Sequence, residues 1–204
     1  MFFFTKTPSF IRRFYSQYLW NVNTLNKEIY LTFDDGPTAD VSTWVLDQLK
    51  KNDAKATFFC LGKQIIAQPA IFQRMRDEGH SIGNHGDQHL NGWKTSKTNY
   101  LLDYKRGQKL TNSKLYRPPY GKIKKGQAQS ILADGNQIVL WDIMPGDWKE
   151  NISSQKVLRN ILGNIENGSI IVLHDNEKAH KHLKYVLPIL LKTLKLFGFQ
   201  LKGL

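Results

Sequence analysis

The stretch Ile170-Ile171-Val172-Leu173-His174-Asp175 decides the fold, because its apolar run is not interrupted by polar residues. A continuous apolar strand is buried on both faces, which is typical of a parallel sheet covered by helices. The run ends in a histidine and an aspartate, where a buried strand would ordinarily end in a turn residue. The stretch therefore predicts a parallel sheet and a site at the end of one of its strands.

Three further strand-like runs end in groups that can bind a metal or move a proton. They lead into YLTFDDGP at residues 30–37, GNHGDQH at residues 83–89 and LWDIMPGDW at residues 140–148. In a parallel α/β barrel the carboxyl ends of the strands meet at one face, where the following loops converge. We therefore expect these polar side chains to gather in one site.

Strand-like runs alternate with helical patterns along the chain, at residues 28–33, 55–60, 80–83, 115–117, 137–141, 169–173 and 199–202. Between several of them apolar residues recur at helical spacing, as from Val41 to Leu49 and from Val157 to Ile165. An alternation of this kind can close into a barrel. With 204 residues, 41% of them hydrophobic, and no linker or repeat, the chain has the size of one large domain.

The charge balance is basic, with 29 Lys and Arg against 17 Asp and Glu and a net charge of +12. The lysines are dispersed, and no helix-turn-helix, zinc-finger or RNA-recognition pattern accompanies them, so we expect no nucleic-acid partner. An anionic polymer of another kind remains open. The single cysteine, Cys60, excludes an internal disulfide and is interpreted as a packed strand residue.

The N-terminal residues carry aromatic and basic side chains. The apolar patch at residues 2–4 is too short for the core of a signal peptide or for a membrane span. Residues 10–20 are predicted to form a surface helix packed on the protein, with a weak membrane-surface contact as the alternative. No export signal is visible, which leaves a cytoplasmic and an envelope-associated location open.

His85 and His89 stand four positions apart, so that on a helical turn both imidazoles would face the same way and hold one metal ion. Asp35 is the best third ligand. Asp34 and Asp35 would repel each other unless positive groups stabilised them, and the metal and Arg117 would do so. The alternatives are an incidental surface pair of histidines and an aspartate that caps a helix in Asp-Gly-Pro turn chemistry.

Five stretches in order carry a resemblance to a known family: TFDDGP at residues 32–37, the two histidines at 85 and 89, RPPYG at residues 117–121, DW at residues 147–148, and IVLH at residues 171–174. They resemble the motifs of the polysaccharide deacetylases, the fourth carbohydrate esterase family. The resemblance implies an α/β fold, a distorted (β/α)7-8 barrel of the NodB homology type. Residues 27–204 would be the catalytic domain, and residues 1–26 a segment packed on or beside the barrel.

The resemblance further implies a metal-dependent hydrolase that removes N-acetyl groups from a polysaccharide containing N-acetylglucosamine, either peptidoglycan or chitooligosaccharide. Asp35, His85 and His89 would bind one divalent ion, zinc in the first place, with cobalt, manganese or nickel as alternatives by ligand type. Asp34 would be the general base toward a metal-bound water, and His174 would be the acid that protonates the leaving amine.

Two supporting pairs and a sugar pocket are implied in the same way. Arg117 would pair with Asp34, and Asp147 with His174, which would push the pKa values of base and acid apart. Tyr120 and Trp148 match family positions that shape the sugar pocket, and the backbone N–H of Tyr120 would hold the oxyanion. Val172 and Leu173 would line the cavity for the acetyl methyl group.

Two positions depart from the family pattern. Gly86 stands in place of the usual Ser or Thr beside the first metal histidine, and Met144 in place of a polar residue. Trp93 could stack on a sugar or lie in the core.

We expect the protein to be a monomer.

Other functions stay open on the same barrel. An O-acetyl esterase acting on xylan and a hydrolase of a small amide would use the same attack by water. A carbohydrate-binding relative without catalysis would be expected to lose Asp34 or His174, and both are present.

Overall fold

The computed structural model describes residues 4–204, and its strands form one parallel sheet. The strands are β1 (Glu28–Asp34), β2 (Thr57–Cys60), β3 (Ser81–Asn84), β4 (Leu115–Tyr116), β5 (Gln137–Ile138), β6 (Ile170–His174) and β7 (Gln200–Leu201). Their order is β5-β4-β3-β2-β1-β6, and β7 pairs with the start of β1. The predicted α/β class and all seven predicted strand regions are therefore confirmed.

Residues 1–3 lie outside the described residues. They include most of the short apolar start and belong to the predicted N-terminal segment, residues 1–26. Within residues 4–204, no helix combines the length and the apolar character needed to cross a bilayer.

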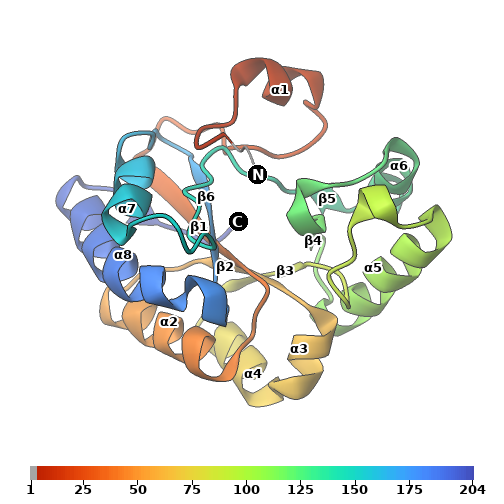
Figure 1. Cartoon of the computed structure of the whole chain (residues 1–204), viewed down its shortest axis with the longest axis horizontal. Coiled ribbons are helices and arrows are strands. Elements are labelled where there is room, and N and C mark those ends of the chain that lie inside the picture. Colours follow the sequence, from red (N-terminus) through yellow and green to blue (C-terminus); the bar gives the residue numbers. More distant parts are fainter. Residues whose placement is uncertain (1–3) are drawn as a thin grey trace.

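Helices surround the sheet as a ring, and α1 (Ser9–Phe14) stands outside that ring (Figure 1). The others are α2 (Ala39–Lys51), α3 (Gly62–Ala67), α4 (Pro69–Asp77), α5 (Lys97–Thr111), α6 (Lys125–Ala133), α7 (Ser154–Leu162) and α8 (Glu177–Leu196). Two 3-10 turns, η1 (Gly92–Lys94) and η2 (Pro119–Gly121), follow β3 and β4.

The sheet closes into a distorted barrel through the segment that follows β5. Val139 N–H donates to Tyr116 O of β4 at 2.8 Å, whereas Asp142 N–H donates to Ile170 O of β6 at 3.2 Å. Between them Leu140 N–H donates to Leu19 O at 2.7 Å, so the N-terminal segment fills the gap between the two strands. Because the hydrogen-bond partner changes after Val139, β5 is shorter than the strand predicted over 137–141.

The helix predicted over residues 10–20 is only partly correct. It spans Ser9–Phe14, and none of its residues is buried. Phe10 and Phe14 are 68% and 77% exposed. The chain then turns so that Leu19 can join the barrel, and this pairing is incompatible with a helix that continues to residue 20.

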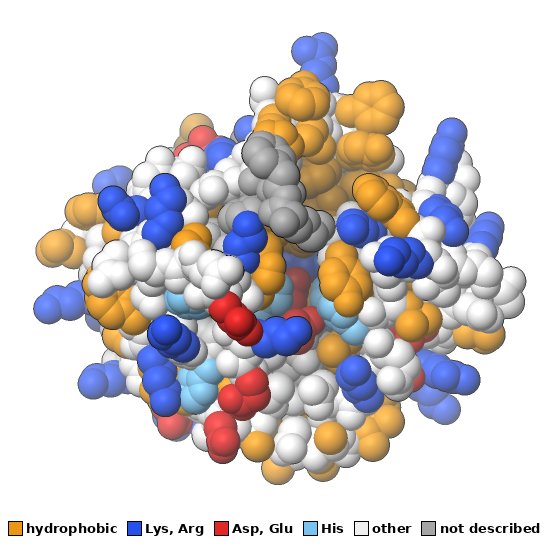
Figure 2. Space-filling model, in the orientation of Figure 1, with side chains coloured by type: hydrophobic (Ala, Val, Ile, Leu, Met, Phe, Trp, Pro, Cys, Tyr) orange, Lys and Arg blue, Asp and Glu red, His pale blue; other side chains and the backbone are white. Residues whose placement is uncertain are grey.

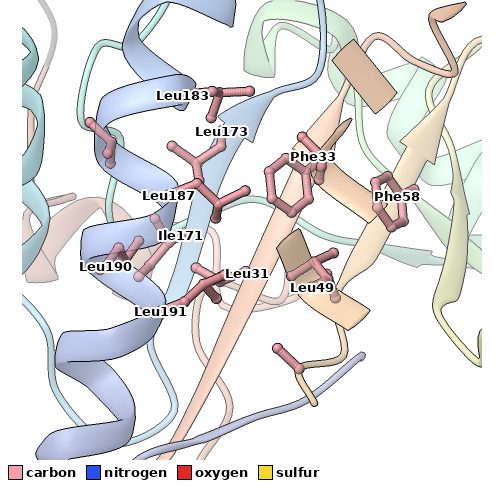
Figure 3. Close-up of a cluster of buried hydrophobic side chains, with 14 of the residues drawn as sticks. Leu31, Phe33, Leu49, Phe58, Ile171, Leu173, Leu183, Leu187, Leu190 and Leu191 are labelled. Carbon is pink, nitrogen blue, oxygen red and sulfur yellow. The ribbon is translucent and has the colours of Figure 1, made fainter. Parts of the chain in front are cut away.

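Alternation along β1 and β6 decides which side chains face the barrel interior, because successive residues of a strand point to opposite faces. Leu31, Phe33, Ile171 and Leu173 point outward and pack against α2 and α8 (Figure 3). Their neighbours at even positions of β1 and β6 point inward, toward the site. Leu173 is therefore a core residue facing α8, and the prediction that it lines the acetyl cavity is wrong.

Truncating Leu187, which packs between α8 and β6, should destabilise the fold. Leu187 is fully buried in the main core cluster, so Leu187→Ala is expected to lower the free energy of unfolding by about 2–5 kcal/mol. Leu196→Ala on the same helix is the matched control, because Leu196 is 80% exposed and its truncation should change the value by less than about 0.5 kcal/mol. Urea unfolding followed by circular dichroism measures both. Equal losses for the two variants would contradict this packing.

Candidate active site

The polar ends of the strands meet in a pocket of about 600 Å³ at the barrel mouth, the face formed by the carboxyl ends of the strands. Figure 2 shows histidine and acidic side chains at the bottom of a hollow near the middle of this face, with lysines around it. A pocket of this volume is in the usual range for binding sites of small ligands. The structure therefore has a pocket at the position where the four strand ends predicted a site.

Asp35, His85 and His89 form a three-residue group whose ligand atoms all lie within 4.8 Å of one another. Asp35 Oδ1 lies 3.1 Å from His89 Nε2 and 3.6 Å from His85 Nε2. The histidines do not lie on a helical turn, as the spacing predicted, but on a loop in which Gly86 and His89 have φ values of 81° and 62°. The left-handed backbone, rather than helical periodicity, brings the two imidazoles together.

His85 is held in one neutral tautomer. Its Nδ1 lies 2.8 Å from the carbonyl oxygen of Arg117. Because a carbonyl only accepts, Nδ1 carries the proton and Nε2 keeps its lone pair toward Asp35. Burial lowers the pKa of His85 to about 4, so the ring stays uncharged, as a metal ligand must be.

Asp35 presents one carboxylate oxygen to this group and is held by the other. Oδ2 accepts a 2.7 Å hydrogen bond from Asn176 Nδ2, while Oδ1 is buried and forms no hydrogen bond. Burial raises the pKa of Asp35, but the close approach of His89 and the charge of His174 outweigh it and keep the pKa well below its usual value. An unsatisfied buried carboxylate oxygen facing two imidazole nitrogens fits a divalent transition metal.

Gly86 is explained by Asp103, a buried residue of α5 that motif reasoning missed. Asp103 accepts hydrogen bonds from the backbone N–H groups of Asp87 and Gln88, at 3.0 and 2.8 Å. A Cβ at position 86 would lie 2.4 Å from Asp103 Oδ2. The carboxylate thus braces the histidine loop. Its sequence signal was an aspartate between Tyr100 and Tyr104 on the buried face of a helix.

Arg117 lies fully buried inside the barrel and pairs with Asp34. Its Nη1 is 2.7 Å from Asp34 Oδ1 and 2.6 Å from Thr32 Oγ1. Its Nη2 and Nε donate to the carbonyl oxygens of Leu140 and Val139, at 2.9 and 3.3 Å. Only one oxygen of Asp34 is occupied by the guanidinium, and Oδ2 lies 3.9 Å from His85 Nε2 at the pocket.

His174 pairs with Asp147, which uses both of its oxygens. Oδ1 lies 3.0 Å from His174 Nδ1, and Oδ2 accepts the backbone N–H of the same residue at 2.8 Å. Burial lowers the pKa of His174, but the charge of Asp147 and this hydrogen bond outweigh it and raise the pKa to about 10. The ring is therefore cationic at neutral pH, and Nε2 remains for the pocket.

The other predicted contact residues are divided between pocket and core. Tyr120, Trp148 and Val172 line the pocket, and the Tyr120 ring packs edge-on against His89 with centroids 4.4 Å apart. Met144 and Trp141 line it as well. Trp141 was not predicted as a site residue, because in the sequence it stands at the end of an apolar run and was interpreted as part of a strand.

Two aspartates near the motifs have supporting positions. Asp142 is buried and pairs with Lys6 at 2.7 Å, away from the pocket. Asp175, also buried, accepts the N–H of Gly36 at 3.0 Å and the hydroxyl of Ser42. Burial raises the pKa of Asp175 to about 7. It fastens the loop that carries Asp35 to α2.

Comparison with known proteins agrees with this architecture. A family model described as polysaccharide deacetylase matches residues 21–139. A Bacillus cereus peptidoglycan-N-acetylglucosamine deacetylase is 36% identical over 75% of this chain, and a Listeria monocytogenes peptidoglycan-N-acetylglucosamine deacetylase is 35% identical over 86%. The chain spans only 58% and 37% of the lengths of these two relatives.

A solved structure shares the fold. The crystal structure of a peptidoglycan N-acetylglucosamine deacetylase in complex with a hydroxamate superposes with a TM-score of 0.87 at 32% identity, over 92% of this chain and 91% of the other. The distorted barrel expected from the motifs is therefore confirmed.

Asn176 should control metal affinity, because it holds the second oxygen of Asp35 while its Oδ1 caps α8 by accepting Ala179 N–H. Asn176→Ser keeps a good capping residue but is too short to hold Asp35. We expect it to weaken zinc binding about 10–100-fold, as measured by competition with a chromogenic chelator.

Ser153→Ala is the matched control for that experiment. Ser153 caps α7, so its loss should cost about 1 kcal/mol of stability without changing zinc affinity. Unaltered zinc binding in Asn176→Ser would show that Asn176 acts only as a helix cap.

Proposed function

Because the chain belongs to the polysaccharide deacetylase family, we propose that it is a metal-dependent hydrolase that removes N-acetyl groups from an N-acetylglucosamine-containing polysaccharide. One observation carries the proposal: a single pocket contains a carboxylate paired with a buried arginine and a histidine paired with a buried aspartate, beside the three-residue ligand group. The relatives are named as peptidoglycan deacetylases, which makes peptidoglycan the first substrate to test and chitooligosaccharide the second.

Asp35, His85 and His89 would hold one divalent ion, zinc by preference for this mixed set of nitrogen and oxygen ligands, with cobalt, manganese or nickel as alternatives. When bound there, the ion supplies a Lewis acid that polarises the acetyl carbonyl and lowers the pKa of water. Asn176 and the carbonyl of Arg117 orient two of the ligands through their second polar atoms.

Asp34 is the proposed general base. Arg117 occupies Oδ1 and fixes the carboxylate, which leaves Oδ2 to accept a proton from the water that attacks the acetyl carbon. The backbone N–H of Tyr120 is the proposed donor to the oxyanion, since Tyr120 has a left-handed φ of 62° and its ring packs on His89. Trp148 and Val172 would enclose the acetyl group in the pocket.

His174 is the proposed general acid. Its pKa of about 10, raised by Asp147 against the effect of burial, keeps the ring protonated at working pH. Collapse of the tetrahedral intermediate breaks the C–N bond, and His174 gives a proton to the departing sugar amine. Base and acid thus belong to two separate ion pairs, so that neither neutralises the other.

The catalysis is assigned to residues 27–204, in a protein that acts as a monomer, with residues 4–26 packed beside the barrel. An O-acetyl esterase or a small-amide hydrolase would use the same groups. The relatives named as peptidoglycan deacetylases favour a polymer over a small amide, and the intact ion pairs of Asp34 and His174 argue against a purely binding relative.

Acetate release tests the proposal directly. Peptidoglycan, chitooligosaccharide and acetylxylan should be compared with zinc present, with chelator, and with Asp34→Asn. We expect release from peptidoglycan that needs zinc and falls at least about 100-fold in Asp34→Asn, the loss typical of a missing general base. Faster release from acetylxylan would favour the esterase, and no release from any polymer with zinc bound would contradict the proposal.

The pH dependence tests His174. The acid is present below its pKa and is lost as pH rises through about 10, so activity should fall on the alkaline side near that pH. Asp147→Asn removes the strongest cause that raises the pKa of His174, while the charges of Asp35 and Asp34 still raise it and burial still lowers it. The alkaline limb of the pH–rate profile should therefore move to lower pH, below about 10.

Asp142→Asn is the control for this shift, because Asp142 is equally buried nearby but pairs with Lys6 outside the pocket. Its alkaline limb should stay where the parent protein has it. If the limb of Asp147→Asn also stayed near pH 10, His174 would not be the acid.

A further inference from the structure

Trp93, which could have been a core residue, lies on the surface with 61% of its area exposed. Single exposed apolar side chains are common and need no explanation by themselves. What distinguishes Trp93 is the loop beneath it and the residues beside it.

The loop that carries Trp93 is anchored by contacts that do not use the indole. Asn91 Oδ1 accepts the N–H of Trp93 at 3.0 Å, and Gln127, which is fully buried, donates to the carbonyl of Gly92 at 3.0 Å. A Cβ at position 92 would lie 2.3 Å from the carbonyl oxygen of Lys122, so only glycine allows this close approach. The fold thus holds the backbone of Trp93 in place while leaving the indole exposed.

This place adjoins the pocket. η1 and η2 follow β3 and β4, which pair in parallel, so both turns lie at the barrel mouth. The Tyr120 ring contacts His89, and two residues later the Lys122 ammonium lies over the Trp93 ring, 5.1 Å from its centroid. Tyr120 and Trp93 are 55% and 61% exposed. Two exposed aromatic side chains therefore lie on this side of the barrel mouth, Tyr120 in contact with His89 and Trp93 in contact with Lys122.

An exposed indole with an ammonium group over its ring matches one kind of ligand. The flat face of an aromatic ring packs on the C–H face of a pyranose, as amphipathic aromatic side chains do in wet binding sites. The Lys122 ammonium over this ring can pair with a carboxylate as a point charge. We infer that Trp93 and Lys122 form a second subsite, which binds a carboxylate-bearing sugar unit of the strand whose acetamido sugar occupies the pocket. This inference rests on the proposed function.

Kinetics on strands of different length and charge test the subsite. The substrates are a short and a long neutral chitooligosaccharide, and peptidoglycan strands with and without their peptides. The variants are Trp93→Ala and Lys122→Gln, with Phe197→Ala as the control. Phe197 is also exposed, at 52%, but it caps the far end of α8, away from the barrel mouth.

Trp93→Ala is expected to raise KM on the long strands and to lower the ratio of kcat/KM for the long over the short oligosaccharide at least fivefold. Lys122→Gln should raise KM only on strands that carry carboxylates. An effect on peptide-free strands assigns the carboxylate to the sugar, and an effect confined to peptide-bearing strands assigns it to the peptide. Phe197→Ala should match the parent protein on all four substrates.

An unchanged ratio of kcat/KM for the long over the short oligosaccharide in Trp93→Ala would overturn the subsite. Lys122 would then only pack over the indole. Binding of the long strands, measured by calorimetry without turnover, separates this failure from a failure of the proposed function. If the parent releases no acetate but Trp93→Ala still weakens binding at least fivefold, the subsite stands and the catalytic proposal falls. Binding that is absent or equal in both proteins overturns the subsite.

Discussion

The buried Arg117–Asp34 pair is the constraint on which the rest of the barrel depends. A guanidinium with no solvent exposure would cost several kcal/mol if its charge and donors were left unpaired. The structure meets this demand with Asp34 and Thr32 of β1, the carbonyl oxygens of Val139 and Leu140, and the Phe59 ring 4.0 Å from the guanidinium carbon. The side chain thereby connects β1, β2 and the segment that closes the barrel.

The backbone of the same residue organises the ligand loop. Arg117 N–H donates to Asn84 O of β3, and Arg117 O accepts from His85 Nδ1. A shift of β4 would therefore disturb Asp34, His85 and the closure of the barrel together. This coupling explains why a charged residue occupies the barrel interior, where an apolar side chain would satisfy packing alone.

The sequence predicted well those features that depend on local pattern. Continuous apolar runs predicted the parallel strands. The polar residues that end these runs predicted the pocket, because the carboxyl ends of parallel strands in a barrel all lie at one face. The prediction for Leu173 was wrong because it rested on the position of Leu173 in the motif. Strand alternation points Leu173 to the face opposite Val172, and Val172 lines the pocket. The prediction of a helical turn for His85 and His89 was wrong because a spacing of four residues cannot distinguish such a turn from a loop with left-handed backbone at Gly86 and His89. The supporting positions of Asp103 and Asn176 could not be predicted, because their hydrogen-bond partners lie 15 and 141 positions away in the sequence.

The two histidines of the pocket show which information the motifs lack. His85 is buried and His174 is partly buried, and burial lowers the pKa of both. His85 faces a carbonyl, which holds the neutral tautomer, and its pKa falls to about 4. His174 faces the Asp147 carboxylate, and its pKa rises to about 10. Because the partner of Nδ1 differs in this way, the pKa values of the two rings move in opposite directions, and one histidine is suited to bind a metal and the other to donate a proton. The division of roles in this pocket is thus set by the residues behind the ligands, which a motif does not record.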